Sequence, residues 1–235
     1  VLPRPKEDTD RAIRRNAQDI LREFVMTFVS FFAKKQIIIA VLFLLLFRLP
    51  EALLTPVSQL FLQALPSKGG LGLSPQEFGL VNGTIGVIGF LVGGVIGGML
   101  ISRDGLKKWL WPMTLAITIP NLTYVYLAYV MPENLMLINV CVAIENLGYG
   151  FGFSAYMLFM IYFSQGEHKT SHYALCTGLM ALSMMLPGLF AGALAQAAGY
   201  RLFFIIVMIS CLLPFCVASF LKIDANFGKK EREEE

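Results

Sequence analysis

Six long apolar runs restrict this chain to a membrane-spanning fold. Each run holds about 20 predominantly apolar residues, the length that an α-helix needs to cross a bilayer core about 30 Å thick. Lipid offers no hydrogen-bond partners to an open backbone, so we expect these runs to be helices. Only 15% of the residues are charged, which excludes an ordinary soluble domain. The predicted spans are 36–65, 78–102, 110–130, 135–163, 173–195 and 202–221.

Basic residues gather on one side of these spans. If the spans alternate in direction, sixteen of the 19 Lys and Arg residues fall on the side that carries both termini. Lys68 and Arg201 fall on the opposite side, and Arg48 lies within the first span. Because cytoplasmic loops carry an excess of Lys and Arg, we expect both termini of this segment in the cytoplasm.

The chain divides into three predicted parts. Residues 1–35 form a cytoplasmic linker, in which apolar residues recur at helical spacing over 13–32. This spacing predicts an amphipathic helix on the membrane surface, and a plain lead-in to the first span is the alternative. Residues 36–222 form the transmembrane bundle, and residues 223–235 form a charged cytoplasmic tail.

An offset of 94 residues aligns the two halves of the bundle. With this offset Glu51 matches Glu145, and the segment GMLISRDGLK matches GALAQAAGYR. Each copy contains three spans, an odd number, so the second copy is inverted relative to the first. Inverted three-helix repeats are typical of secondary transporters. The predicted fold is therefore all-α, an integral membrane bundle of six helices arranged as a 3+3 inverted repeat.

Ionisable side chains lie deep within two predicted spans. At 1.5 Å per residue, Arg48 and Glu145 each lie about 15–18 Å into the bilayer, near its midplane. Glu51 follows Arg48 by three residues on the same helix face, so we expect a local ion pair. Asn146 and Tyr149 add polar groups beside Glu145.

Two hypotheses explain these intramembrane charges. In the first, a structural ion pair locks the first and fourth spans together. In the second, the side chains line a water-filled cavity, as intramembrane ionisable groups on solute and proton pathways do. Arg48 would then contact an anionic or polar group of the solute, and Glu51 or Glu145 would carry a proton.

Small residues recur four positions apart in two spans. Gly89, Gly93 and Gly97 repeat in the second span. In the fifth span the repeated pairs are Gly188 with Gly192 and Ala191 with Ala195. Such spacing places the glycines on one helix face, where a neighbouring helix can approach closely. We therefore predict helix-packing seams at both places.

The remaining polar residues give no sign of an enzyme. His168 and His172 are interpreted as a solvated loop pair, and no catalytic set or phosphate-binding loop occurs in the sequence. We expect no enzyme activity, metal, cofactor or nucleic-acid partner. Four residues are interpreted as small core side chains: Cys141, Cys176, Cys211 and Cys216.

The segment GMLISRDGLKK resembles the loop motif of the major facilitator superfamily, G-x-L-x-D-R-x-G-x-K/R-K/R. In that family the motif follows the second helix of each six-helix half, which is its place here. Ser102 stands where the family has an acid, a departure that affects the charge relay of that loop. The matching residues, proposed as a gating loop, are Gly98, Leu100, Arg103, Gly105, Lys107 and Lys108.

Three further segments resemble AmpG-type muropeptide permeases. VAIENLGYGFGFSAYMLFM and KTSHYALCTGLMALSMMLPGLFAG are similar to the fourth and fifth helices of their C-terminal half, and FRLPEA to its first helix. The resemblance implies the C-terminal half of a twelve-helix transporter in the bacterial inner membrane, with an N-terminal six-helix half as its partner. It also implies proton-driven import of muropeptides or related wall fragments by alternating access. The residues that would surround the solute are Arg48, Glu51, Glu145, Asn146 and Tyr149.

Two other functions remain open at this point. The first is a major facilitator carrier for another solute, such as a sugar, a drug or a metabolite. The second is a membrane scaffold or receptor that transports nothing, which would need no accessible charges at the midplane.

Overall fold

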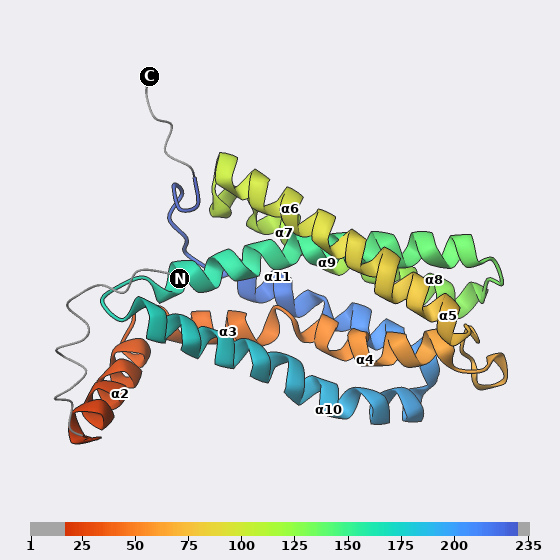
Figure 1. The fold of residues 1–235 in the computed structure, drawn as a ribbon, viewed down its shortest axis with the longest axis horizontal. Helices are drawn as coiled ribbons and strands as arrows, with labels where there is room; N and C mark the ends of the chain where they lie inside the picture. The colour runs from red at the N-terminus through yellow and green to blue at the C-terminus, as the bar shows by residue number, and fades with distance from the viewer. Residues whose placement is uncertain (1–16, 230–235) are drawn as a thin grey trace, which may run out of the picture.

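Helices that run along one long axis make up the described part of the chain (Figure 1). The computed structural model describes residues 17–229, and no strand occurs within that range. Five helical stretches are long and apolar enough to cross a membrane, as expected of a multi-pass membrane protein. They are Ile37–Gln63, Pro75–Asp104, Leu106–Val130, Leu135–Ser164 and Lys169–Ser219.

The first stretch is broken in the middle. It consists of α3 (Ile37–Leu46) and α4 (Leu49–Gln63), where the sequence predicted a single span over 36–65. Pro50 lies in the first turn of α4 and has no N–H to donate, so a continuous helix would lose a hydrogen bond there. The carbonyl of Leu44, near the end of α3, accepts a hydrogen bond from the Tyr156 hydroxyl of α9 (2.7 Å).

The second stretch begins with a short α-helix and a π-helical segment. Ser74 and Glu77 form a capping box at the start of α5 (Pro75–Phe78), in which each side chain accepts a backbone N–H of the other residue. The π-helix η2 (Gly79–Gly86) follows, and α6 (Val87–Asp104) completes the span.

The third stretch is interrupted and the fourth is not. A single 3-10 turn, η3 (Ile119–Asn121), separates α7 (Leu106–Thr118) from α8 (Leu122–Val130), because Pro120 cannot continue the α-helical hydrogen bonds. The fourth stretch is one uninterrupted helix, α9 (Leu135–Ser164).

The fifth stretch contains a reversal of the chain. α10 (Lys169–Ser210) includes Gly199, whose φ of 74° and ψ of 157° are not helical, and α11 (Leu212–Ser219) follows. A straight 51-residue helix would be about 77 Å long, more than twice a bilayer core. The chain turns back toward its starting end here (Figure 1). The loop predicted between 173–195 and 202–221 is thus reduced to one non-helical residue.

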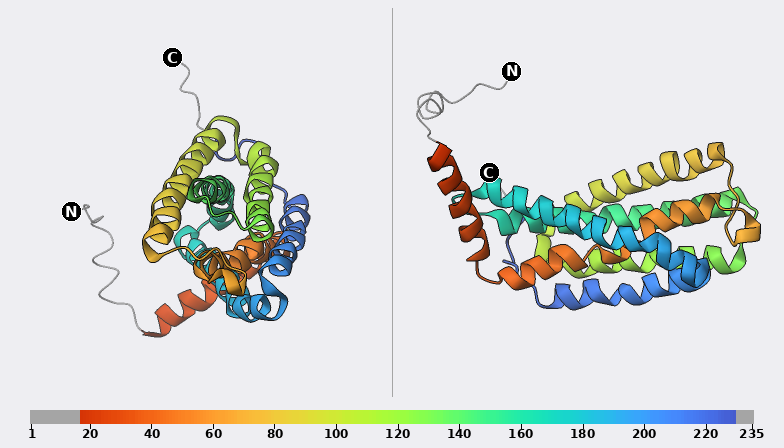
Figure 2. Two further views of the ribbon diagram at one scale, coloured as in Figure 1. Left: turned by 90° about the vertical axis from the view of Figure 1, so that its right-hand side faces the viewer. Right: turned by 90° about the horizontal axis from the view of Figure 1, so that it is seen from below.

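α9 lies near the middle of the bundle, as the end-on view in Figure 2 shows. It packs mainly against α6 on one side and α7 on another, while α4 packs mainly against α10. Glycines make these approaches possible. A Cβ at Gly150 would overlap the carbonyl of Phe90 on α6, and a Cβ at Gly148 would overlap the carbonyl of Ala116 on α7.

A separate helix, α2 (Ala17–Phe32), lies across one end of the bundle (Figure 2). Phe31 is buried against the rings of Phe163 and His172, and the Ser30 hydroxyl lies 3.0 Å from His172 Nε2. His172 is only 3% exposed, so the prediction of a solvated histidine was wrong at this position. Its ring is covered because α2 packs back onto the start of α10.

Parts of two predicted segments lie outside the described residues, and one cysteine differs from its prediction. Residues 13–16 of the predicted amphipathic helix and residues 230–235 of the predicted tail lie outside the described residues. Three of the cysteines are buried as expected, whereas Cys216 is exposed on α11, a face that the sequence could not distinguish from the core.

Candidate functional site

Arg48 lies at the break between α3 and α4, inside the bundle. Its side chain is surrounded by three aromatic rings of α9: the guanidinium carbon lies 5.6, 4.7 and 5.7 Å from the ring centres of Tyr149, Phe153 and Tyr156. It also donates a hydrogen bond to the Tyr149 hydroxyl. Cation–π contacts of this kind stabilise a cation that has been removed from water. Arg48 is 6% exposed, so aromatic rings rather than water surround its guanidinium group.

Glu51 does not form the local ion pair that the sequence predicted. No carboxylate oxygen lies within 4 Å of Arg48 in the described part of the chain. The Arg48 side chain instead points toward α9, and Glu51 accepts a hydrogen bond from Asn121 Nδ2 (3.1 Å). The two residues share a helix face in sequence, but the break at Pro50 changes the geometry on which that pairing depends.

Asn121 is the residue of this site that sequence analysis missed. It is 2% exposed and lies in the 3-10 turn that Pro120 introduces into the third span. A Pro-Asn pair inside an apolar run was the available signal, since a proline break frees nearby backbone and often accompanies polar side chains. Asn121 brings the third span into contact with Glu51.

Glu145 occupies the matching depth on α9. It is 6% exposed and accepts a hydrogen bond from the neighbouring Asn146 Nδ2 (2.7 Å), which also donates to the Val142 carbonyl (3.0 Å). Neither Glu145 nor Glu51 has a cation within 4 Å among residues 17–229. The structure thus contains two buried carboxylates held by amide groups and one buried guanidinium held by aromatic rings.

Two polar atoms of this cluster make no hydrogen bond to the described protein atoms. They are Nε of Arg48 and Oδ1 of Asn121, both buried. Buried polar groups normally have partners, so such atoms are suited to contact water or a bound molecule. We call Arg48, Glu51, Asn121, Glu145 and Tyr149 together the central polar cluster.

Three glycines of α6 lie directly against α9. A Cβ at Gly89 would come within 3.0 Å of the Ala143 carbonyl, and one at Gly97 within 2.7 Å of the Ser154 hydroxyl. A Cβ at Gly93 would overlap the Leu147 carbonyl. The α6–α9 contact therefore requires the absence of side chains at these positions.

The glycines of the fifth span do not lie as close to another helix as those of the second. A Cβ at Gly188 would meet the Ala52 carbonyl at 3.8 Å, an ordinary contact, and one at Gly192 would meet nothing within 4 Å. The predicted close packing at Gly192 was therefore wrong. Ala191 and Ala195 are buried on this part of α10, whereas the two glycines have no close neighbour.

Comparison with known proteins gives the family context. No family model matches the chain. Over 192 residues, 81% of its length, it is 25% identical to "Putative transporter AmpG 1" of Rickettsia prowazekii. Over 176 residues, 75% of its length, it is 26% identical to "Anhydromuropeptide permease" of Escherichia coli K12.

The chain is homologous to AmpG-type transporters. It spans less than half the length of these curated relatives, 41% of the Rickettsia protein and 35% of the Escherichia coli protein. A Haemophilus influenzae relative of 24% identity, "Uncharacterized protein", is likewise matched over 46% of its length. The described helices are those of a multi-pass membrane protein, and the Rickettsia and Escherichia coli relatives are named as a transporter and a permease.

The proposed gating loop of this AmpG-like chain is built around an acid that its motif did not predict. Asp104 accepts hydrogen bonds from Arg103 (2.9 Å) and from the Trp109 indole N–H (3.0 Å), and it lies 3.3 Å from Lys108 Nζ. It therefore joins the end of α6 to the start of α7. The acid missing at Ser102 is supplied two residues later.

The other residues of the loop lie on its surface or at its turn. Lys107 is exposed, and a Cβ at Gly98 would meet no atom within 4 Å. Gly105 has a φ of 90°, a conformation that side chains disfavour, and it lies beside the Ala225 carbonyl. Leu106 donates its N–H to the Phe227 carbonyl (2.9 Å), so the segment after α11 lies against this loop.

Replacing Asp104 by asparagine should loosen the loop without unfolding the bundle. The substitution removes the charge that Arg103 and Lys108 share while keeping the shape of the side chain. We expect several-fold faster trypsin cleavage after Arg103 in detergent-solubilised protein. Glu167→Gln, which removes an exposed carboxylate at the same end, should leave the cleavage rate unchanged, and equal rates in Asp104→Asn and wild type would contradict the role of Asp104.

Metal binding has no obvious basis in the described residues. No group of three or more His, Cys, Asp or Glu side chains within 17–229 is placed to hold a metal ion.

Proposed function

We propose that this chain is the C-terminal six-helix half of a proton-coupled secondary transporter of the major facilitator superfamily. In this proposal it crosses the bacterial inner membrane six times, as a 3+3 inverted repeat, and pairs with an N-terminal six-helix half. The complete protein imports a muropeptide or a related solute by alternating access. The central polar cluster is the observation that carries the proposal.

Two pairs of residues support the inverted repeat. Gly105 and Gly199, which are 94 positions apart, have nearly the same backbone conformation, with φ of 90° and 74° and ψ of 156° and 157°. Pro120 and Pro214 have the same separation, and each lies beside an interruption of its span. Counting the reversal at Gly199 as a turn gives six crossings, three in each repeat.

The burial of the cluster supports transport over a scaffold role. Burying three ionisable groups within membrane spans costs free energy, because lipid cannot solvate their charges. A scaffold could fill the same space with apolar side chains at no such cost. Carboxylates held only by amides, as Glu51 and Glu145 are, are groups that can bind and release a proton.

The proposed division of labour follows from these contacts. Arg48 contacts an anionic or polar group of the solute through the Nε atom that makes no protein hydrogen bond. Glu145 carries the proton, because its amide partner Asn146 is half-buried, whereas Asn121, the amide partner of Glu51, is fully buried. Tyr149 and Asn146, which are half-buried, connect the cluster to the surface where the N-terminal half would lie.

The experiment uses the full-length protein in right-side-out bacterial membrane vesicles. We expect labelled anhydromuropeptide to accumulate when an inward proton gradient is imposed, and accumulation to stop when a protonophore is added. Accumulation that persists without a gradient would contradict proton coupling.

Competition separates this function from its alternatives. Excess unlabelled muropeptide should suppress uptake, whereas sugars and unrelated drugs should not. Suppression by one of those compounds instead would identify a major facilitator carrier for another solute. A scaffold or receptor predicts no accumulation at all, and no reaction of cysteines at positions 48 and 145 with soluble thiol reagents in the full-length protein.

A further inference from the structure

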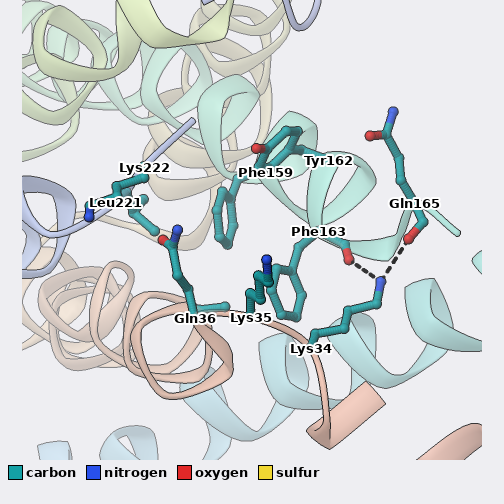
Figure 3. Close-up of a pocket in the computed structure, with 10 residues that line it drawn as sticks. Lys34, Lys35, Gln36, Phe159, Tyr162, Phe163, Gln165, Leu221 and Lys222 are labelled. Atoms are coloured by element: carbon teal, nitrogen blue, oxygen red, sulfur yellow. Dashed lines mark hydrogen bonds between the residues drawn. The ribbon is translucent and has the colours of Figure 1, made fainter. Parts of the chain in front are cut away.

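A cavity of about 470 Å³ opens at the end of the bundle where α2 lies. It is lined by the connection between α2 and α3, by the last turn of α9 and by the residues that follow α11 (Figure 3). The central polar cluster contributes no residue to it. The cavity is therefore a different place from the proposed transport site, and an inference about it does not rest on the proposed function.

The polar wall of the cavity is strongly basic. Lys34, Lys35 and Lys222 line it, and no carboxylate occurs among its described lining residues. Lys34 Nζ donates hydrogen bonds to the carbonyls of Phe163 (2.5 Å) and Gln165 (2.8 Å) at the end of α9. These bonds occupy two of its three protons, so Lys34 is fixed in place with one donor left.

Apolar side chains form another part of the lining. They are Ala40, Phe159, Phe163 and Leu221, and the Lys34 ammonium lies 5.2 Å from the centre of the Phe163 ring. Partial burial lowers the pKa of Lys34, and an anion in the cavity would counteract that effect by favouring the charged form. A ligand that contacts both the lysines and the apolar side chains carries an anionic group next to hydrocarbon.

The backbone conformation of Gln36 is a second observation that favours a binding site in this cavity. It has a φ of 62°, a left-handed conformation that is unfavourable for a residue with a side chain. Strained backbone of this kind persists where the surroundings require it, commonly at binding sites. In the view of Figure 3, the Gln36 amide lies with Lys35 between Lys222 and Lys34.

The cavity lies at the end of the bundle, the level that a membrane surface would reach if the apolar helices cross the bilayer. α2 ends at Phe32, two residues before Lys34, and lies across the bundle rather than along it. Its exposed side chains Val25, Met26 and Val29 are apolar, as expected of a helix that lies in the interfacial region. Phospholipid phosphates occupy this same level of a bilayer.

We propose that this cavity binds the phosphate group of an anionic phospholipid from the leaflet at this end of the bundle. Lys35 and Lys222 contact the phosphate, and Gln36 donates an amide N–H to it. The glycerol and the start of the acyl chains lie against Phe159 and Leu221. A bound lipid at this point would fix the connection between α2 and the first span.

The test measures the thermal stability of the purified full-length protein in detergent, with defined additions. Phosphatidylglycerol should raise the melting temperature, whereas phosphatidylcholine and inorganic phosphate should not. Lys35→Gln combined with Lys222→Gln should weaken the apparent affinity for phosphatidylglycerol by about thirtyfold, as the loss of two lysines near an anionic surface predicts. Gln36→Gly should also weaken it, without lowering the melting temperature in the absence of lipid, because glycine relieves the left-handed strain.

A matched variant controls for net charge. Lys169→Gln combined with Lys229→Gln removes two lysines from the same end of the bundle, outside the cavity, and should leave the response to phosphatidylglycerol intact. Equal weakening in both double variants would overturn the site, because it would show a general surface-charge effect. Stabilisation by inorganic phosphate alone would overturn the lipid assignment and indicate a soluble phosphate ligand.

Discussion

Replacing Glu145 by glutamine is expected to abolish proton-driven accumulation of solute while leaving the protein folded in the membrane. Glutamine has nearly the same shape and can keep a hydrogen bond with Asn146, but it cannot take up or release a proton. Net uptake in vesicles with an imposed proton gradient should fall to background. Exchange of labelled for unlabelled solute at equal concentrations should persist, because exchange requires no net proton movement.

Glu133→Gln is the matched control for this result. Glu133 is an exposed carboxylate just before α9, the helix that carries Glu145, and it lies at the opposite end of the bundle from α2. This variant should accumulate solute as the wild type does. Unchanged accumulation in Glu145→Gln, at equal protein abundance in the membrane, would remove Glu145 from the proton pathway.

Replacing Gly93 by valine is expected to prevent the bundle from folding. A Cβ at this position overlaps the Leu147 carbonyl and would approach the Phe151 N–H to 2.9 Å, so backbone rather than a flexible side chain must move. Overpacking against backbone should cost more than about 3 kcal/mol, since 1–3 kcal/mol is typical even where side chains can adjust. Fluorescence-detected size-exclusion chromatography of solubilised membranes should show loss of the monodisperse peak.

Gly98→Val provides the comparison on the same helix. A Cβ there meets nothing within 4 Å, and the residue lies five positions further along α6. The two variants add the same side chain and lose the same backbone freedom. If Gly98→Val lowers the yield of folded protein as much as Gly93→Val does, the close α6–α9 contact is not the cause.

The spans were predicted well where apolar length alone defines them. α9 extends one residue beyond the predicted 135–163, because no proline interrupts it and Asn134 caps its start. The first and third spans were placed correctly but the extent of their breaks was not, since the sequence shows a proline without showing whether the helix bends or stops there. A loop was predicted between residues 195 and 202, and the reversal at Gly199 lies within that range.

The candidate site was predicted in part. Arg48, Glu51 and Glu145 are buried within the bundle, as charged side chains deep in a membrane span are expected to be. The hydrogen-bond and ion-pair partners of these residues were not predicted correctly. The expected pairing of Arg48 with Glu51 failed and Asn121 was missed, because both depend on which helices lie next to each other.

The sequence by itself determined that this is a helical membrane protein, where its spans lie and which of them carry charge. These properties are local: apolar length, helix rise and the cost of charge in lipid act on each segment separately. Only the tertiary structure decided that aromatic rings of α9 enclose Arg48, that Asn121 holds Glu51 and that Gly93 contacts α9 while Gly192 contacts nothing close. Such contacts depend on how helices distant in sequence rotate and pack, and no spacing within one span contains that information.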